Sequence, residues 1–197
     1  MKTAKLVFTN EAYEKTLALV DKFSTEVQWH GFITRRGNSC FVIEDIIVPP
    51  QIVGAATVDT DEVAYDSWEY TIPDDKFSKM RLHGHSHVNF GCSPSGVDRD
   101  YRKEKLTSFR GEKENAFYIF MIVNKRQNVE CEIYDIRNRK AYSTRSNNIE
   151  FFIQKSSSHC ENIENFITDA ISKAKIEHKF KANTAVRTTE GNLWALT

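Results

Sequence analysis

Residues 83–98 read HGHSHVNFGCSPSGVD, and this stretch decides which fold and which site the chain is expected to form. Alternate side chains of a strand project to the same face, so His85 and His87 are expected to point the same way at the end of a strand. Further along, Ser95 is a favourable helix N-cap, and Asp98 follows it at the spacing of a capping box. The stretch therefore predicts a strand end and a helix start that carry two imidazoles and one carboxylate.

These three side chains form a ligand set that suits zinc. A catalytic zinc site uses three protein ligands, drawn from imidazole nitrogens and carboxylate oxygens among others, and keeps one position for water. An H-x-H pair alone is weak support, because such pairs also occur in surface loops or as hydrogen-bonded groups near a core. The pair His83-x-His85 does not continue into the same pattern, since the position matching Asp98 is then Gly96, which cannot bind a metal. The expected ligands are therefore His85, His87 and Asp98, and His83 is expected to be a supporting strand residue.

The complete pattern, H-x-H-x(7)-S-x(2)-D, resembles the JAMM motif of the JAB/MPN metallopeptidases. Phe90-Gly91-Cys92 and the segment 95–98 are similar to the metal loop of the proteasome-lid and signalosome isopeptidases. Those proteins usually have a proline directly after the second histidine, where this chain has Val88. That departure leaves the ligands intact but changes the loop, and prokaryotic and phage members of the family tolerate it. The resemblance covers residues 5–145.

The resemblance implies an α/β fold of three layers, similar to that of cytidine deaminases, in which a mixed β-sheet is flanked by helices. Residues 1–150 would form this JAB/MPN domain. Residues 151–197 would add a C-terminal amphipathic helix, which either docks on the core or forms a homodimer, and a tail.

The family also uses a glutamate as general base. It lies where the first helix gives way to a strand, a few residues before a glycine, and Glu26 stands at that place before Gly31. A surface acid at a helix end is the plain alternative. Glu44 and Glu62 are the other candidates, but Glu44 lies within a predicted hairpin and lacks the following glycine.

In the family's mechanism, zinc held by His85, His87 and Asp98 lowers the pKa of water from about 15.7 toward about 7. Glu26 would accept the proton and pass it to the leaving amine, and Ser95 would donate a hydrogen bond to the developing oxyanion. Because the zinc ligand set is complete without it, Cys92 is expected to be structural.

The resemblance implies hydrolysis of a peptide or isopeptide bond. Eukaryotic members cut the isopeptide bond at the C-terminus of ubiquitin, and others process ubiquitin-like or sulfur-carrier proteins or act in phage tail assembly. The expected partner is a protein or peptide with an extended, Gly-rich C-terminal tail. Two alternatives stay open: a non-catalytic MPN-type binding or scaffold protein, and a hydrolase of a small-molecule or peptidoglycan amide.

Composition limits the kinds of binding partner and the cell compartment that are expected for this protein. The chain has 197 residues with 27 basic and 27 acidic side chains, so no global field draws it to nucleic acid or to an anionic membrane. No apolar run approaches the roughly 20 residues that span a bilayer, and the N-terminal residues do not resemble a signal peptide. The four cysteines form no C-x-x-C pair. A cytoplasmic protein with reduced thiols is expected.

Hydrophobic periodicity predicts the order of elements along the chain. Asn10 is expected to cap the first helix, and Ser24 and Thr25 to end it. A linker is expected at 156–158 and a tail at 183–197. The remaining predictions are a strand at 5–9, a hairpin at 27–48, an extended pair at 56–65, helices at 74–80, 95–106 and 163–174, a polar loop at 110–115, strands at 116–124 and 129–135, and an edge strand at 137–142.

Overall fold

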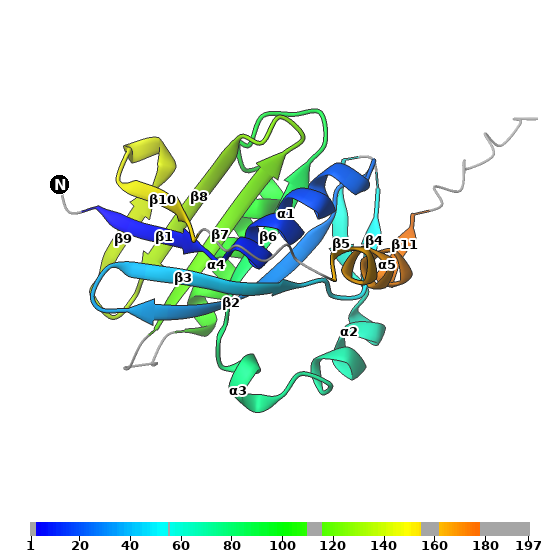
Figure 1. Ribbon diagram of the computed structural model, residues 1–197, viewed down its shortest axis with the longest axis horizontal. Coiled ribbons are helices and arrows are strands. Elements are labelled where there is room, and N and C mark those ends of the chain that lie inside the picture. Colours follow the sequence, from blue (N-terminus) through cyan, green and yellow to red (C-terminus); the bar gives the residue numbers. More distant parts are fainter. Residues whose placement is uncertain (1–2, 55, 110–115, 155–161, 178–197) are drawn as a thin grey trace, which may run out of the picture.

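A mixed eight-stranded sheet organises the protein, for which a computed structural model describes residues 3–54, 56–109, 116–154 and 162–177 (Figure 1). The strand order is β10-β1-β3-β2-β6-β7-β8-β9. A small second sheet has the order β11-β4-β5. In chain order the strands are β1 (Ala4–Phe8), β2 (Gln28–Arg36), β3 (Cys40–Ile47), β4 (Gln51–Val53), β5 (Val58–Thr60), β6 (Met80–His87), β7 (Phe117–Asn124), β8 (Val129–Asp135), β9 (Lys140–Ser143), β10 (Ile149–Ile153) and β11 (Ala174–Ile176).

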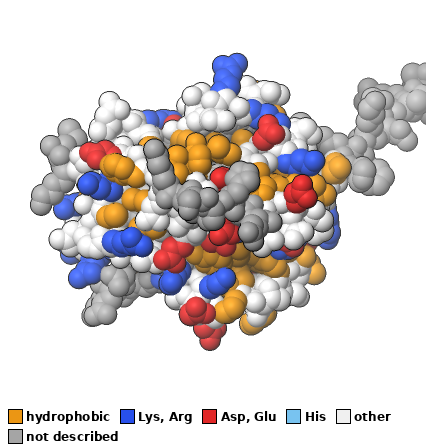
Figure 2. All heavy atoms as spheres, viewed as in Figure 1, with side chains coloured by type: hydrophobic (Ala, Val, Ile, Leu, Met, Phe, Trp, Pro, Cys, Tyr) orange, Lys and Arg blue, Asp and Glu red, His pale blue; other side chains and the backbone are white. Residues whose placement is uncertain are grey.

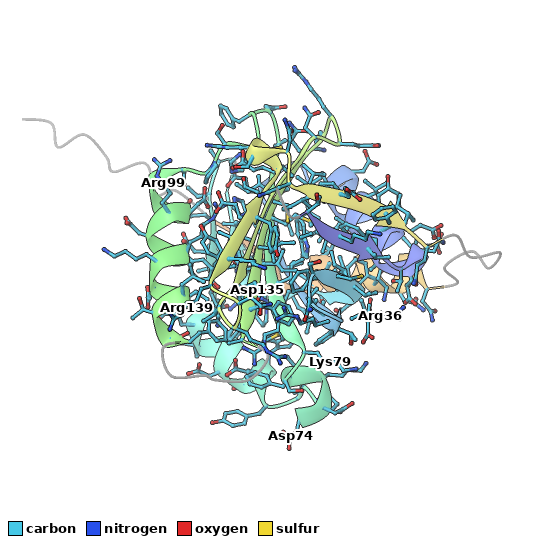
Figure 3. All side chains as sticks on the ribbon, turned by 90° about the vertical axis from the view of Figure 1, so that its left-hand side faces the viewer. Arg36, Asp74, Lys79, Arg99, Asp135 and Arg139 are labelled. Atoms are coloured by element: carbon cyan, nitrogen blue, oxygen red, sulfur yellow. The ribbon has the colours of Figure 1, made fainter. Side chains whose placement is uncertain are left out.

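Helices cover both faces of the large sheet. They are α1 (Asn10–Lys22), α2 (Glu62–Glu69), α3 (Asp74–Phe77), α4 (Gly96–Ser108) and α5 (Ile163–Lys173), with a short 3-10 turn, η1 (Thr144–Ser146). In Figure 3, α4 lies on one side of the sheet and α1 on the other. The strand β7 is buried along its whole length, because helices pack on both of its faces. Its residues Ile119 and Met121 join the cluster that includes α1, whereas Tyr118 and Phe120 pack toward α4. The prediction of a mixed α/β protein with a sheet flanked by helices is confirmed.

The N-cap of the first helix lies one residue before the predicted cap, Asn10. Thr9 is the N-cap, because its backbone is extended and its Oγ1 accepts a hydrogen bond from the Ala12 N–H at 3.1 Å. Asn10 is already helical, and its side-chain amide donates instead to Glu14. The helix ends at Lys22, with Phe23 as its C-cap, before Ser24 and Thr25.

The predicted hairpin at 27–48 is confirmed as the antiparallel pair β2 and β3. The extended pair predicted at 56–65 is wrong in its second half. β5 contributes three residues and pairs with β4, and Asp61 then caps α2 by accepting from the Ala64 N–H. The helix predicted at 74–80 ends at Phe77, and Met80 already belongs to β6.

The C-terminal part of the described chain returns to the body of the protein twice. β10, which the sequence did not predict, pairs in parallel with β1, so the predicted boundary at residue 150 falls within a strand of the large sheet. Next, α5 docks on α1 through Phe166, Ile167 and Ala170. β11 then pairs in parallel with β4. The predicted loop at 110–115, the linker at 156–158 and the tail at 183–197 lie outside the described residues.

No helix in the described ranges is long and apolar enough to cross a bilayer.

The strand that carries the histidines is held against β2 by a close ring contact. Trp29 on β2 is almost fully buried, and it lies directly opposite Gly84 on β6. A Cβ atom added at Gly84 would come within 2.3 Å of the Trp29 ring. Gly84 is therefore required by the packing of the indole, one residue before His85.

Gly84→Ala should destabilise the protein by about 2 kcal/mol or more, because the buried indole has no free space into which it can retreat. Urea unfolding of the purified protein measures this change. Gly96→Ala is the matched control, since an added Cβ there meets no atom within 4 Å. If both variants unfold at the same urea concentration, the proposed contact does not constrain the strand.

Candidate metal centre

The position of β6 between β2 and β7 determines where the histidines lie. β6 pairs antiparallel with β2 and parallel with β7, so both of its edges are occupied. Because side chains alternate along a strand, His85 and His87 share one face, as the sequence predicts. On the opposite face, Ser86 Oγ accepts a hydrogen bond from the Val27 N–H at 3.0 Å. The strand backbone beneath the two imidazoles is thus held by β2, by β7 and by the hydrogen bond between Ser86 and Val27.

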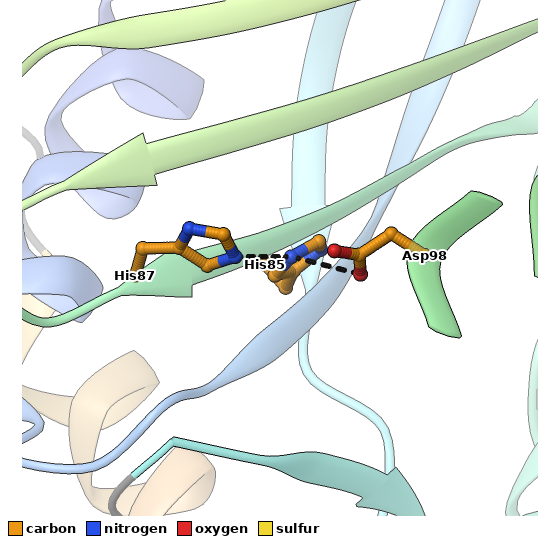
Figure 4. Close-up of side chains that lie close together, drawn as sticks. All are labelled: His85, His87 and Asp98. Carbon is orange, nitrogen blue, oxygen red and sulfur yellow. Dashed lines mark hydrogen bonds and ion pairs between the residues drawn. The ribbon is translucent and has the colours of Figure 1, made fainter. Parts of the chain in front are cut away.

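The three predicted ligand side chains converge (Figure 4). Nε2 of His85 lies 3.1 Å from Nε2 of His87 and 3.2 Å from Oδ1 of Asp98. One ligand atom from each of the three residues falls within 4.8 Å of the others. Atoms bound tetrahedrally to one zinc ion at about 2.0–2.1 Å lie about 3.3 Å apart. The spacing of these donors therefore suits a single ion of that size.

Hydrogen bonding sets the tautomer of His87. Its Nδ1 lies 2.8 Å from the carbonyl oxygen of Gly91. A carbonyl oxygen can only accept, so Nδ1 carries the proton and Nε2 presents its lone pair to His85. Nε2 of His85 therefore faces an imidazole lone pair on one side and a carboxylate oxygen on the other. Such a set of acceptors is stable around a proton or a metal cation, and this observation supports metal binding.

Asp98 is positioned by a capping box at the start of α4, as predicted. The Ser95 N–H donates to Oδ2 of Asp98 at 2.6 Å, and the Asp98 N–H donates to Oγ of Ser95 at 3.2 Å. The second carboxylate oxygen, Oδ1, is left to face His85. One carboxylate therefore serves the helix with one oxygen and the candidate metal site with the other.

The charges of the cluster favour metal-binding protonation states. Burial lowers the pKa of His85 to about 4, although Asp98 acts in the opposite direction. The pKa of Asp98 is lowered: its burial opposes ionisation, but His85 and the hydrogen bonds from Ser95 outweigh that penalty. At neutral pH His85 is thus a neutral imidazole and Asp98 a carboxylate, the forms that bind metal ions.

Glu26, the predicted base, lines the same cavity as the three ligand side chains and Ser95. Glu26 is 7% exposed, and its backbone N–H donates to the carbonyl oxygen of Gly54 at 3.1 Å. Burial raises the pKa of Glu26, and the nearby charge of Asp98 raises it further, while His87 lowers it. A carboxylate with a raised pKa holds a proton more readily than an exposed one, as a general base requires.

The cavity that joins these residues has a volume of about 340 Å³. The β6 histidines, the α4 face and the β4–β5 hairpin border it. The sequence did not single out the hairpin, nor Gln28, Tyr101 and Arg102, as cavity residues. Tyr101 and Arg102 follow Asp98 by nearly one helical turn, and that spacing is the signal that could have identified them.

Two further histidines extend the row of imidazoles behind the ligands. His30 on β2 lies directly opposite His83 on β6, with ring centroids 5.8 Å apart. His83 also packs on Tyr101, and Tyr65 Oη lies 3.2 Å from His30 Nε2. Nδ1 of each histidine is buried without a hydrogen-bond partner in the described part of the chain. His83 lines the cavity but does not join the three-residue ligand group, and its supporting role stays a prediction.

The other candidates lie elsewhere. Cys92 donates through Sγ to the Asn128 carbonyl oxygen at 3.0 Å, and burial raises the pKa of its thiol, so it behaves as a structural residue. Glu44 forms an ion pair with Lys79, and Glu62 is an exposed residue of α2. Neither glutamate lines the cavity.

No protein-family model matches this sequence, and no curated protein matches it either. The functional conclusion therefore depends on the geometry of the site.

Burial of His30 makes the stability of the metal-free protein depend on pH. Burial lowers the pKa of His30 to about 4, and the charge of Lys105 acts in the same direction. Below about pH 6.5 the unfolded chain binds a proton at this residue, and the folded protein excludes that proton until about pH 4. The free energy of unfolding should therefore fall through this window, by up to about 1.4 kcal/mol per pH unit for one histidine.

His30→Gln should reduce this slope by about one proton, because glutamine does not titrate but can still bond to Tyr65. Urea unfolding in a chelator, from about pH 7 to about pH 4.5, measures the slope in both proteins. Equal slopes would contradict the assignment.

Proposed function

We propose that this protein is a zinc-dependent hydrolase of the JAB/MPN type that cleaves a peptide or isopeptide bond. The observation that carries the proposal is the convergence of His85 Nε2, His87 Nε2 and Asp98 Oδ1 in one cavity with Glu26. A mixed sheet with helices on both faces is compatible with the three-layer fold of that family. Bound zinc would polarise the scissile carbonyl and make water a nucleophile near neutral pH.

Glu26 supplies the proton transfer in this proposal. Its burial raises its pKa, so the carboxylate accepts a proton from water more readily and passes it to the leaving amine. Because Glu26 is attached to the β4–β5 hairpin through its N–H, its carboxylate keeps its place at the cavity wall. His85, His87 and Asp98, which line the same cavity, would hold the ion.

Ser95 is placed for two roles. A hydroxyl group has lone pairs that accept and one proton that it donates. As N-cap, Ser95 Oγ accepts from the Asp98 N–H, and its own hydroxyl also bonds to the Asp98 carboxylate. A turn of the hydroxyl would direct its proton to the oxyanion that develops during hydrolysis, as in other sites where such a donor contributes about 2.7–4 kcal/mol.

An extended tail is the substrate that fits the cavity wall. β5 is an edge strand of the small sheet, and residues 58–60 line the cavity. A peptide can add beside such an edge through main-chain hydrogen bonds. This geometry favours a peptide or isopeptide substrate, including a ubiquitin-like or other Gly-rich tail, over a small amide.

Zinc should bind in a ratio of one ion per chain and stabilise the protein. A ligand at about 100 times its Kd adds about 2.7 kcal/mol to the free energy of unfolding. Metal analysis and thermal unfolding with zinc and with a chelator measure both effects. His87→Ala should abolish them, whereas His83→Asn, four positions earlier on the same strand, should retain the ion. A wild-type protein that neither binds zinc nor changes its melting temperature in chelator would refute the proposal.

Glu26→Gln should keep zinc but lose hydrolysis by a factor of about 10²–10⁴, since glutamine cannot accept the proton. The assay uses a panel of peptide, isopeptide-linked and small amide substrates. Glu62→Gln is the control, because this exposed glutamate does not line the cavity. Hydrolysis that survives Glu26→Gln would show that another group is the base.

A further inference from the structure

A second hollow of about 550 Å³ lies beside the metal cavity. It runs between α4, β8 and η1, and it shares Arg102 with the metal cavity. Four basic side chains line it, together with a single acidic one among the described residues. We call it the basic groove and define it by Arg99, Arg102, Lys103, Glu132 and Arg145.

The helical repeat of α4 creates this concentration of charge. The sequence of α4 mixes acids and bases, and the whole chain has a net charge of zero. Figure 2 shows acidic and basic side chains interspersed over one face of the protein. However, residues at positions i, i+3 and i+4 share one side of a helix, which brings Arg99, Arg102 and Lys103 together. The acids Asp100 and Glu104 do not line the groove.

The wall of the groove is held in place by ion pairs. Arg102 Nη1 lies 2.9 Å from Glu132 Oε2, which also accepts from Tyr134 Oη at 2.7 Å. The Arg102 guanidinium is nearly buried and lies over the Phe120 ring. At the far side, Arg145 Nη2 lies 2.8 Å from Glu130 Oε2, although its side chain is 53% exposed.

Some donors of the basic side chains in the groove remain available to a ligand. Each arginine has five N–H donors, and the contact of Arg145 with Glu130 uses one of them. Arg99 Nη1 donates to the Pro94 carbonyl oxygen at 3.0 Å, and Figure 3 shows Arg99 projecting from the start of α4. Lys103 is exposed and has no ion-pair partner among the residues that the structure describes. A carboxylate-rich ligand would complement these groups.

The groove and the metal cavity share a border. Pro94 and Arg99 line the groove, while their neighbours Ser95 and Asp98 line the metal cavity. A polypeptide that leaves the metal cavity over the start of α4 would therefore meet the groove within a few residues, since each extended residue spans about 3.3 Å.

We propose that the basic groove binds an acidic segment of the polypeptide whose amide bond is hydrolysed at the metal centre. This inference rests on the proposed function, because it makes the ligand of the groove part of the substrate. An acidic polypeptide suits the groove better than a nucleic acid does, because the whole chain has a net charge of zero and so has no extended positive field that would draw a nucleic acid. The groove thus supplies a preference for substrates with aspartate or glutamate near the cleaved bond.

Binding is tested first with the full chain in a chelator, where no hydrolysis occurs. The probe is a fluorescein-labelled peptide with a run of six Glu and Asp residues, and its counterpart has Gln and Asn instead. The acidic peptide should bind at least about tenfold more tightly at low salt, and the difference should shrink as salt screens the charges. Equal binding of the two peptides would overturn the proposal.

Charge variants locate the site. Lys103→Glu and Arg145→Gln should each weaken binding of the acidic peptide by about three- to tenfold. Lys76→Glu, which reverses an exposed lysine of α3 outside the groove, should leave it unchanged. An unchanged affinity in Lys103→Glu would place the binding elsewhere. A single-stranded RNA that binds more tightly than the acidic peptide, and loses affinity in Lys103→Glu, would assign the groove to nucleic acid instead.

Cleavage then links the groove to the metal centre. With zinc, an amide substrate that carries the acidic run should have a higher kcat/KM than its neutral counterpart, and Lys103→Glu should lower that ratio about three- to tenfold, mainly through KM. If Lys103→Glu leaves kcat/KM for the acidic substrate unchanged, the groove does not take part in substrate binding for the reaction. Absent hydrolysis of every substrate, with acidic-peptide binding intact, would refute the proposed function and not the ligand of the groove.

Discussion

The reciprocal hydrogen bonds between Ser95 and Asp98 link the fold of this protein to its chemistry. They start α4, which packs on one face of the large sheet through Tyr101 and Leu106. The same bonds orient the Asp98 carboxylate, so that one oxygen faces His85 on the neighbouring strand. Arg99, Arg102 and Lys103 take their positions from this helix as well. The metal site, the cavity wall and the basic groove therefore all depend on where α4 begins.

The row of histidines on β6 and β2 illustrates what such a site demands of the folded state. His30 and His85 are buried and His83 is half-buried, and burial lowers the pKa of each, so the folded protein holds them neutral. Two of their nitrogens have no hydrogen-bond partner in the described residues. An unmet buried polar group costs about 1–3 kcal/mol, so this row is tolerated at some expense of stability. That pattern is common at sites shaped for function.

The β4–β5 hairpin, which lines the cavity, is held in place by residues outside the cavity. Gln51 at the start of the hairpin accepts from the Gln28 N–H at 2.8 Å and donates to the Gln28 carbonyl oxygen, joining the small sheet to β2. β11 pairs with the other edge of β4, and Lys175 bonds to Asp61 at the base of the hairpin. β11 and Lys175 thus support the hairpin that lines the cavity beside Glu26.

Local sequence determined much of this protein because its signals act over a few residues. Alternation along a strand put His85 and His87 on one face, and the capping spacing put Asp98 at the start of a helix. The hairpin at 27–48 and the strands β7 and β8 likewise follow from local patterns. Tertiary structure decided the rest, since pairing between distant segments has no local signature. It brought Glu26 and the β4–β5 hairpin close to the metal ligands, and it paired β10 with β1. It also placed the basic side of α4 opposite Glu132 and Arg145, and the basic groove lies between them.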